Sequence, residues 1–251
     1  MTATPTTSAT AVTTGGYVAD TVTFSCVDGP GNRFVVFLQG CNFDCVACHN
    51  PHTIPLATGE HFHTTVADLL PRVRRAAPFI SGITVSGGEA TLQPDFLHEL
   101  FSAVKADPTL GRLTCFVDSN GSCDEATWRH LAPVMDGAMI DLKCFDDVIH
   151  QQMTGQSNEP VLHSIRLLHE MGLLDEVRLL ILRGVNDDPA LLRRTAEWLA
   201  AVDPTMRIKL IGFRAHGARP HEPALEEPTH DALQAIAALL LDVAAFDICV
   251  V

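Results

Sequence analysis

Three cysteines in one short loop constrain this chain more than any other feature. Cys41, Cys45 and Cys48 have the spacing C-x3-C-x2-C within the segment CNFDCVACHNP. Thiols this close in sequence can converge on one soft metal centre without long-range folding. A cubane iron–sulfur cluster has four irons, so three protein ligands leave one iron free to bind something else. The loop therefore predicts an iron–sulfur cluster with one open iron.

Zinc is the alternative occupant of the same loop. A structural zinc site closes its fourth position with another Cys or a His, and His49 directly follows the last thiol. The segment before the loop, residues 33–40, has the sequence RFVVFLQG, which is typical of a buried strand that ends at the first cysteine. Small zinc ribbons rarely have so long a buried strand directly before their metal-binding loop. The segment before the loop therefore favours iron over zinc.

The composition excludes several classes of protein. The chain has 251 residues, 47% of them hydrophobic, which is enough for one sizeable core. Its net charge of −13 argues against nucleic-acid binding, which requires a basic surface. We expect no membrane span, because no run of 18 apolar residues is present. With no secretion signal at the N-terminus, the eight cysteines are expected to be unpaired thiols in the cytoplasm.

Apolar runs alternate with helical patterns along the chain. Six short apolar segments predict strands, at residues 33–39, 82–86, 113–117, 137–142, 177–182 and 207–211. Helices are expected after a cap at Thr64 or Thr65, from Pro94, and near residues 124–132, 159–171, 188–202 and 229–243. Alternation of this kind indicates an α/β fold, a parallel sheet with helices outside. We expect a single domain over 17–251 and a disordered Thr/Ala-rich tail over 1–16.

Polar residues follow the predicted strands at their carboxyl ends, where barrel enzymes keep their active sites. Cys41 follows the first predicted strand, and the segment Gly87-Gly88-Glu89 follows the second. The later strands carry or precede Asp118, Ser119, Asp141, Lys143, Arg178, Arg214 and His216. One site lined by all of these residues is therefore expected.

Taken together, these motifs resemble the radical S-adenosylmethionine (SAM) enzymes, and most closely the activating enzymes of glycyl-radical enzymes. The resemblance rests on six segments in order, namely DGPGNRFVVFLQGC, CNFDCVACHNP, ITVSGGEATLQ, DSNG, MIDLK and GVNDD. It implies an incomplete (β/α)6 TIM-like barrel with one [4Fe-4S] cluster on Cys41, Cys45 and Cys48. It also implies that SAM binds the free iron and is cleaved reductively to methionine and a 5′-deoxyadenosyl radical.

The resemblance assigns several residues to SAM. Gly87 and Gly88 would let the backbone approach the ligand closely, and Glu89 would hold the methionine ammonium. An ordinary glycine-rich turn with a solvated Glu is the bland alternative. Further contacts are implied for Asn50, for Lys143 and Arg178 beside the SAM carboxylate, and for Arg214 or His216.

Two features bear on the rest of the pocket. Ala47 stands where the family usually has an aromatic residue near the adenine, so the adenine contact departs from the family pattern. Similar activating enzymes bind a monovalent cation, Na+ or K+, beside SAM, at positions matched here by Asp118, Ser119, Met139 and Asp141. Turn-forming or helix-capping roles for these aspartates are the alternative.

The expected partners follow from the same resemblance. Asp28 begins the segment DGPGNR, which resembles the lining of the partner-peptide groove and favours a glycyl-radical enzyme as protein substrate. A small-molecule substrate is the second hypothesis, and a non-enzymatic zinc-binding module is the third. A flavodoxin or ferredoxin-type reductant is implied, for which Arg72, Arg74 and Arg75 are a docking candidate if they are not simply a solvated face.

The remaining cysteines predict no second cluster. There is no room between His52 and Thr64 for the cysteine-rich insert that many related enzymes carry there. Lone cysteines in apolar runs are usually core residues, which is the role expected for Cys26, Cys115, Cys123, Cys144 and Cys249.

Metal analysis tests the cluster. After anaerobic reconstitution the protein should be brown and contain about four irons and as many sulfides per chain. Iron and sulfide assays with zinc measured in parallel give the answer. Stoichiometric zinc without iron in anaerobically handled protein would contradict the enzyme hypothesis.

Overall fold

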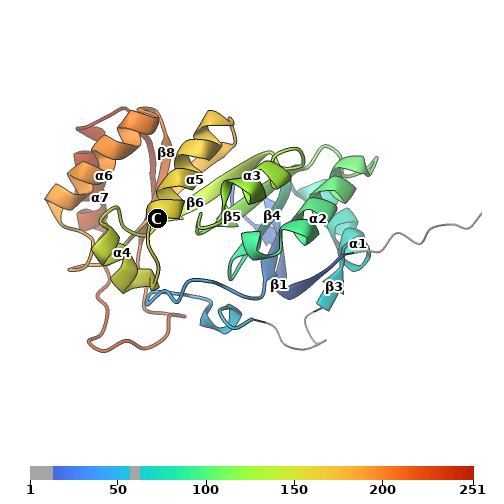
Figure 1. Ribbon diagram of the computed structural model, residues 1–251, viewed down its shortest axis with the longest axis horizontal. Helices are drawn as coiled ribbons and strands as arrows, with labels where there is room; N and C mark the ends of the chain where they lie inside the picture. The colour runs from blue at the N-terminus through green and yellow to red at the C-terminus, as the bar shows by residue number, and fades with distance from the viewer. Residues whose placement is uncertain (1–13, 57–62) are drawn as a thin grey trace, which may run out of the picture.

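One curved sheet organises the part of the chain that the computed structural model describes, residues 14–56 and 63–251 (Figure 1). Its strand order is β3-β1-β2-β4-β5-β6-β7-β8-β9. From β2 to β9 all neighbouring strands are parallel. Their bounds are β2 Arg33–Leu38, β4 Gly82–Gly87, β5 Thr114–Ser119, β6 Gly137–Leu142, β7 Leu174–Ile181, β8 Arg207–Gly212 and β9 Asp247–Val250. All six predicted strands are present, so the predicted α/β barrel-type sheet is confirmed.

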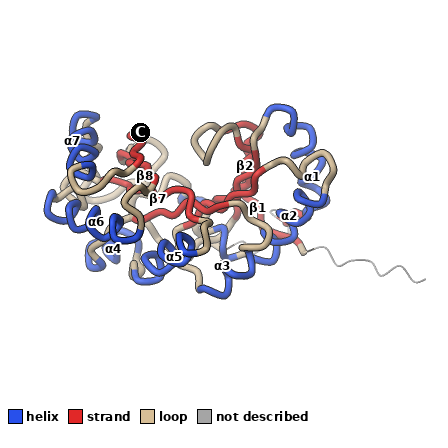
Figure 2. The backbone as a smooth tube through the Cα atoms, turned by 90° about the horizontal axis from the view of Figure 1, so that it is seen from above, coloured by secondary structure: helices blue, strands red, loops and turns tan. Residues whose placement is uncertain are grey.

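Seven α-helices in the described ranges cover the convex side of the sheet (Figure 2). They are α1 Val66–Ala76, α2 Pro94–Ala106, α3 Glu125–Leu131, α4 Asp147–Thr154, α5 Glu159–Glu170, α6 Pro189–Val202 and α7 His230–Leu241. The predicted start of α1 is confirmed in detail, because Thr65 and Asp68 form a reciprocal capping box. No described helix has the length and apolar character needed to cross a membrane.

The helix α4 was not predicted. It is only eight residues long and buries His150, Met153 and Thr154, which do not form an apolar periodic stripe. Gly155, in a left-handed conformation with φ +79°, ends it. Its register therefore depends on what it packs against rather than on its own pattern.

The N-terminal part of the prediction was wrong in two respects. Residues 1–13 of the predicted tail lie outside the described residues, but Gly15 and Gly16 belong to a strand, β1 (Gly15–Ser25). This strand pairs antiparallel with β2, and β3 (His63–Thr65) pairs antiparallel with β1, so the sheet is not wholly parallel. Only Gly16 and Val18 of β1 are buried, which explains why it lacks the apolar run that identified the other strands.

A fully buried arginine closes the amino-terminal end of the sheet. Arg33 donates hydrogen bonds to Thr84 Oγ1 (3.0 Å), Thr114 Oγ1 (2.6 Å) and the carbonyl of Ile83 (2.5 Å), and its guanidinium lies 4.7 Å from the centre of the Phe116 ring. Burial lowers the pKa of Arg33 to about 10. Because a buried cation is costly unless its donors are satisfied, these bonds fix the ends of β2, β4 and β5 together.

Removal of this side chain should destabilise the fold. Arg33→Ala leaves two threonine hydroxyls and a carbonyl without their donor and opens a cavity, so we expect a loss of about 3 kcal/mol in the free energy of unfolding. Urea unfolding followed by circular dichroism measures it. Arg129→Ala, which removes an exposed ion pair with Glu125, should leave that free energy nearly unchanged. Equal stability of both variants would show that the Arg33 network is dispensable.

Candidate metal and cofactor site

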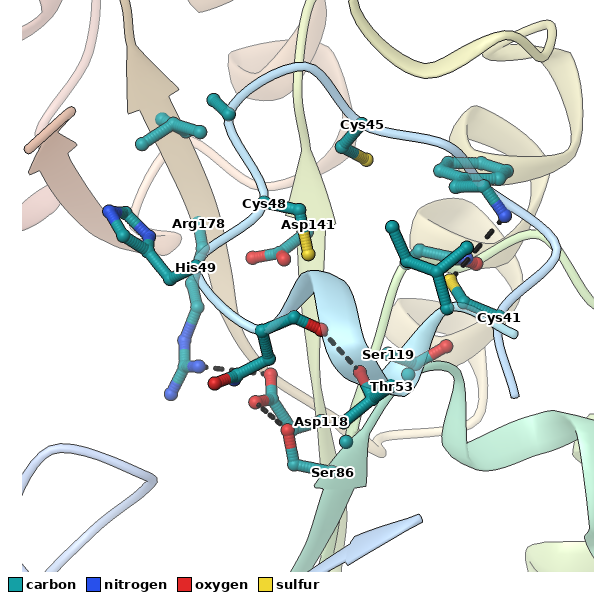
Figure 3. A pocket seen from close by; sticks show the side chains of 18 of the residues that line it. Cys41, Cys45, Cys48, His49, Thr53, Ser86, Asp118, Ser119, Asp141 and Arg178 are labelled. Atoms are coloured by element: carbon teal, nitrogen blue, oxygen red, sulfur yellow. Dashed lines mark hydrogen bonds and ion pairs between the residues drawn. The ribbon is translucent and has the colours of Figure 1, made fainter. Parts of the chain in front are cut away.

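A cavity of about 270 Å³ lies between the cysteine loop and the carboxyl ends of the parallel strands (Figure 3). Most of the residues predicted from the sequence line it. They are Asp28, Cys41, Cys45, Cys48, Asn50, Gly87, Gly88, Asp118, Ser119, Asp141, Lys143 and Arg178. The fold thus brings together side chains from β4, β5, β6 and β7 with one loop that follows β2.

Four predicted residues do not line this cavity. Glu89 is buried beneath it and accepts hydrogen bonds from Thr91, from Ser119 Oγ (2.7 Å) and from the backbone N–H of Asn120 (2.7 Å). Burial raises the pKa of Glu89, and these donors oppose the rise. The sulfur of Met139 accepts from Arg178 at 3.0 Å. Arg214 and His216 are exposed in the segment after β8.

Backbone hydrogen bonds hold the cysteine loop in place. Its first residue is tied to the short turn after the loop, because Cys41 N–H donates to the carbonyl of Ile54 (3.0 Å). The N–H groups of Asp44 and Val46, on either side of Cys45, donate to carbonyls at the end of α4, each at 2.9 Å. The unpredicted helix α4 therefore sets the position of Cys45.

The thiols are in a partly apolar setting. Burial raises the pKa of Cys41 to about 12 and that of Cys45 to about 11. Since the thiolate is the metal ligand, a metal centre must displace protons from both groups, and its binding should strengthen as pH rises.

The geometry of His49 argues against the zinc alternative. Its Nε2 lies 2.7 Å from the carbonyl oxygen of Arg214, and its ring stacks on Phe213 with centroids 6.0 Å apart. A cubane attaches each thiolate to a different iron. Three soft thiols around a cavity fit a cluster better than one zinc ion with His49.

Two cations near the strand ends, Arg178 and Lys143, are paired with carboxylates. Arg178 lies 2.9 Å from Asp118 and 2.8 Å from Glu176, so the expected partner of this inward-facing arginine is present. Burial would lower the pKa of Arg178, but the neighbouring carboxylates outweigh it and raise that pKa. Burial raises the pKa of Asp118, and Arg178 counters this rise. The guanidinium is therefore a fixed positive charge.

The second pair is Lys143 and Asp141, at 2.7 Å. Burial would lower the pKa of Lys143, but Asp141 and other neighbouring anionic groups raise it overall. The ammonium thus remains charged in the cavity wall. A paired ammonium and carboxylate match the carboxylate and ammonium of an amino-acid ligand.

A segment before β2, residues 26–32, spans the sheet from β4 to β8. The carbonyl of Val27 accepts from Lys209 on β8 at 2.8 Å, and the carbonyl of Asp28 accepts from Thr84 on β4 at 2.7 Å. These bonds join two distant parts of the incomplete barrel and place Asp28 in the cavity wall. We call residues 26–32 the crossing segment.

Sequence reasoning missed Glu176, Lys209 and Thr53 as parts of this environment. The sequence could have indicated Glu176, because it lies two residues before Arg178 and therefore on the same face of β7. The contact of Lys209 with Val27 spans 182 residues and had no local sequence signal.

The lone cysteines and the arginines of α1 lie outside the site. Cys115 and Cys144 are buried as expected, and Cys123 is partly buried, but Cys26 and Cys249 are exposed rather than in the core. Arg74 pairs with Asp107 at 2.7 Å, and the helix that carries it, α1, leads into the amino end of β4. The arginine group on α1 thus lies toward the end of the sheet opposite the cysteine loop.

Comparison with known proteins gives a consistent result. A family model described as the radical SAM superfamily matches residues 35–195. The pyruvate formate-lyase-activating enzyme of Streptococcus mutans is 34% identical over 207 residues, covering 80% of this chain and 79% of the relative. The pyruvate formate-lyase 1-activating enzyme of Escherichia coli (strain K12) is 34% identical over 197 residues, covering 76% and 78%. A Haemophilus influenzae relative with the provisional name glycyl-radical enzyme activating enzyme is 33% identical over 219 residues, covering 79% and 82%.

Solved structures share the fold. A domain of pyruvate-formate lyase-activating enzyme from Bacteroides vulgatus has a TM-score of 0.53 at 24% identity, covering 67% of this chain and 99% of that one. Streptococcus suis SuiB bound to S-adenosylmethionine has a TM-score of 0.65 at 12% identity, covering 84% and 48%. At these identities the similarity supports the architecture alone.

The three loop cysteines should behave differently from the others. Cys41→Ala, Cys45→Ala or Cys48→Ala should each abolish reductive cleavage of SAM and lower the iron retained after reconstitution, because each removes one of only three cluster ligands. Cys249→Ala, which removes an exposed thiol, should retain iron like the wild type and still support reductive cleavage of SAM. Iron loss in a folded Cys249→Ala protein would refute the ligand assignment.

Proposed function

Since the chain belongs to the radical SAM superfamily and, within it, to the activating enzymes of glycyl-radical enzymes, we propose that it uses one [4Fe-4S] cluster and SAM to remove a hydrogen atom from a glycine of a partner enzyme. The observation that carries this proposal is the three-cysteine loop facing a charged cavity at the strand ends. When bound, the cluster and SAM supply the electron transfer and the carbon radical that abstracts the hydrogen.

The cavity residues orient the methionine part of SAM. Lys143 faces the carboxylate, and Asp141 and the backbone at Gly87-Gly88 face the ammonium. A side chain at Gly88 has no room, since a Cβ would lie 2.1 Å from the carbonyl oxygen of Gly40. The glycine there lets β4 and the cysteine loop pack closely, which sets the distance between the strand ends and the thiols.

The other predicted SAM residues take more distant roles in this proposal. Glu89 holds the turn at Ser119 and Asn120 through its hydrogen bonds rather than the ammonium directly. Arg178 is held by two carboxylates, Asp118 and Glu176, whereas Lys143 is held by Asp141 alone, so we assign Lys143 to the SAM carboxylate. Asn50 remains a contact because it lines the cavity. Arg214 and His216 would need to turn inward to reach SAM.

Apolar side chains compensate for the small residue at position 47. Ala47 is buried and lines the cavity together with Leu180 and Ile211. We assign the adenine to this side, with aliphatic rather than aromatic contacts.

A monovalent cation, Na+ or K+, would bind between Asp118 and Asp141. Carboxylate oxygens suit such an ion. The other two proposed ligands are turned to internal partners, because Ser119 donates to Glu89 and Met139 accepts from Arg178. The proposal for a cation therefore rests on the two carboxylates, each of which also has an ion pair, Asp118 with Arg178 and Asp141 with Lys143.

The crossing segment supports a peptide substrate. It connects β4 to β8, and its Asp28 lines the cavity, with one carboxylate oxygen accepting a hydrogen bond from Ser25. A carboxylate there can accept backbone N–H groups of an extended peptide or pair with a basic residue near the target glycine.

A flavodoxin or ferredoxin-type protein would supply the electron. The eight unpaired thiols suit the reducing cytoplasm.

The direct test is glycyl-radical formation. The reconstituted protein, SAM and a reductant should produce a glycyl radical, seen by electron paramagnetic resonance, on a glycyl-radical enzyme from the same source. Failure on every such enzyme, with SAM cleavage intact, would favour a small-molecule substrate.

The role of Asp28 can be tested in the same assay. Asp28→Asn should keep the cluster and the slow SAM cleavage without partner, yet reduce radical yield several-fold at limiting partner, because it loses one charge toward the peptide. Asp20→Asn, at an exposed position of β1, is the matched control. Equal yields for the two variants would remove Asp28 from the peptide site.

A further inference from the structure

The segment after β8 folds back over the cysteine loop. It begins at Phe213 and lies beyond residues 35–195, the range that the family model matches. Two contacts already described join it to His49, namely the stacking of Phe213 and the carbonyl of Arg214. A third contact, made by Arg219, reaches the loop at Cys45.

Arg219 binds the loop backbone through two hydrogen bonds from its guanidinium group. Its Nη2 donates to the carbonyl oxygens of Asp44 and Cys45, each at 2.8 Å. Its Nη1 lies 2.7 Å from the Asp44 carboxylate. A planar guanidinium can make these contacts at once, whereas an ammonium is a point charge on a flexible stem.

The two sides of the loop are thus held by different parts of the chain. The Val46 N–H donates to the carbonyl of Met153 in α4, and the Cys45 carbonyl accepts from Arg219. The peptide group that follows Cys45 is therefore fixed at both ends. Asp44 is largely exposed, so its ion pair alone would contribute little. The hydrogen bonds from Arg219 to the two carbonyl oxygens therefore contribute most to fixing the loop backbone.

We propose that Arg219 is a positioning residue that fixes the ligand Cys45 and so keeps the cluster in the protein. This inference rests on the proposed function, because it presupposes a cluster on the loop. The guanidinium also brings a positive charge close to one ligand. A nearby positive charge favours the reduced cluster, which carries one more negative charge than the oxidised one.

Three variants of the full chain separate the hydrogen bonds from the charge. Arg219→Ala removes both the hydrogen bonds and the charge, and Arg219→Lys keeps the charge but not the two guanidinium hydrogen bonds. Arg183→Ala removes an exposed arginine that contacts Glu226 in the same segment, and it is the matched control. Each protein is reconstituted anaerobically. Loss of the cluster absorbance to an iron chelator is then timed, and the reduction potential is measured by redox titration with electron paramagnetic resonance.

Arg219→Ala should lose iron about 10-fold faster than the wild type, a loss typical of residues that orient metal ligands, and its potential should become more negative. Arg219→Lys should lose iron faster than the wild type while keeping a potential near the wild-type value. Arg183→Ala should match the wild type in both measurements. Thermal unfolding by circular dichroism checks that each variant is folded.

Each result that would contradict this proposal has its own pattern of iron loss. Wild-type rates of iron loss in folded Arg219→Ala and Arg219→Lys would overturn the positioning role. If Arg219→Ala does not fold, Arg219→Lys alone decides by the same rate. Faster loss in Arg183→Ala as well would assign the effect to the whole segment and not to Arg219. A wild type that takes up no cluster would instead refute the proposed function.

Discussion

The ion pair between Arg178 and Asp118 is the contact around which the interior of this half-barrel is arranged. It joins β7 to β5 across β6. Arg178 also pairs with Glu176, and Asp118 also accepts a hydrogen bond from Ser86. Buried charges destabilise a fold unless they are paired and hydrogen-bonded, so the strand ends accept these groups only as a connected set. Asp141 and Lys143 follow the same rule. With Asp28 the cavity wall carries three carboxylates against two cations, a balance suited to the net positive charge of SAM.

The crossing segment links two strands that are far apart in the sheet. Val27 is bound to Lys209 on β8, and Asp28 is bound to Thr84 on β4. Thr84 also accepts from Arg33, so the same network closes the amino end of the sheet. The segment proposed to meet a peptide therefore also contributes to holding the strands together.

The cysteine loop depends on three remote elements. The turn at Ile54 fixes its start, α4 holds the N–H groups around Cys45, and the segment after β8 contacts His49 and the Cys45 carbonyl. A loop without regular structure holds three thiols in one arrangement more firmly when its backbone groups have partners, and several of them do here. The contacts of the last element explain why His49 is held away from the thiols.

The sequence by itself determined the parts of this protein that local chemistry encodes. Buried parallel strands are continuous apolar runs, so β2 and β4 to β8 could be located, and the spacing of Cys41, Cys45 and Cys48 indicated their chemistry. Tertiary structure alone decided the rest. The strand β1 lies at the antiparallel side with few buried residues, and α4 has no apolar stripe of its own, so neither had a periodic signal. Glu89 faces Ser119 instead of the cavity, and Arg219 meets Cys45 across 174 residues, because side-chain direction and long-range contacts are set by packing and not by neighbours in sequence.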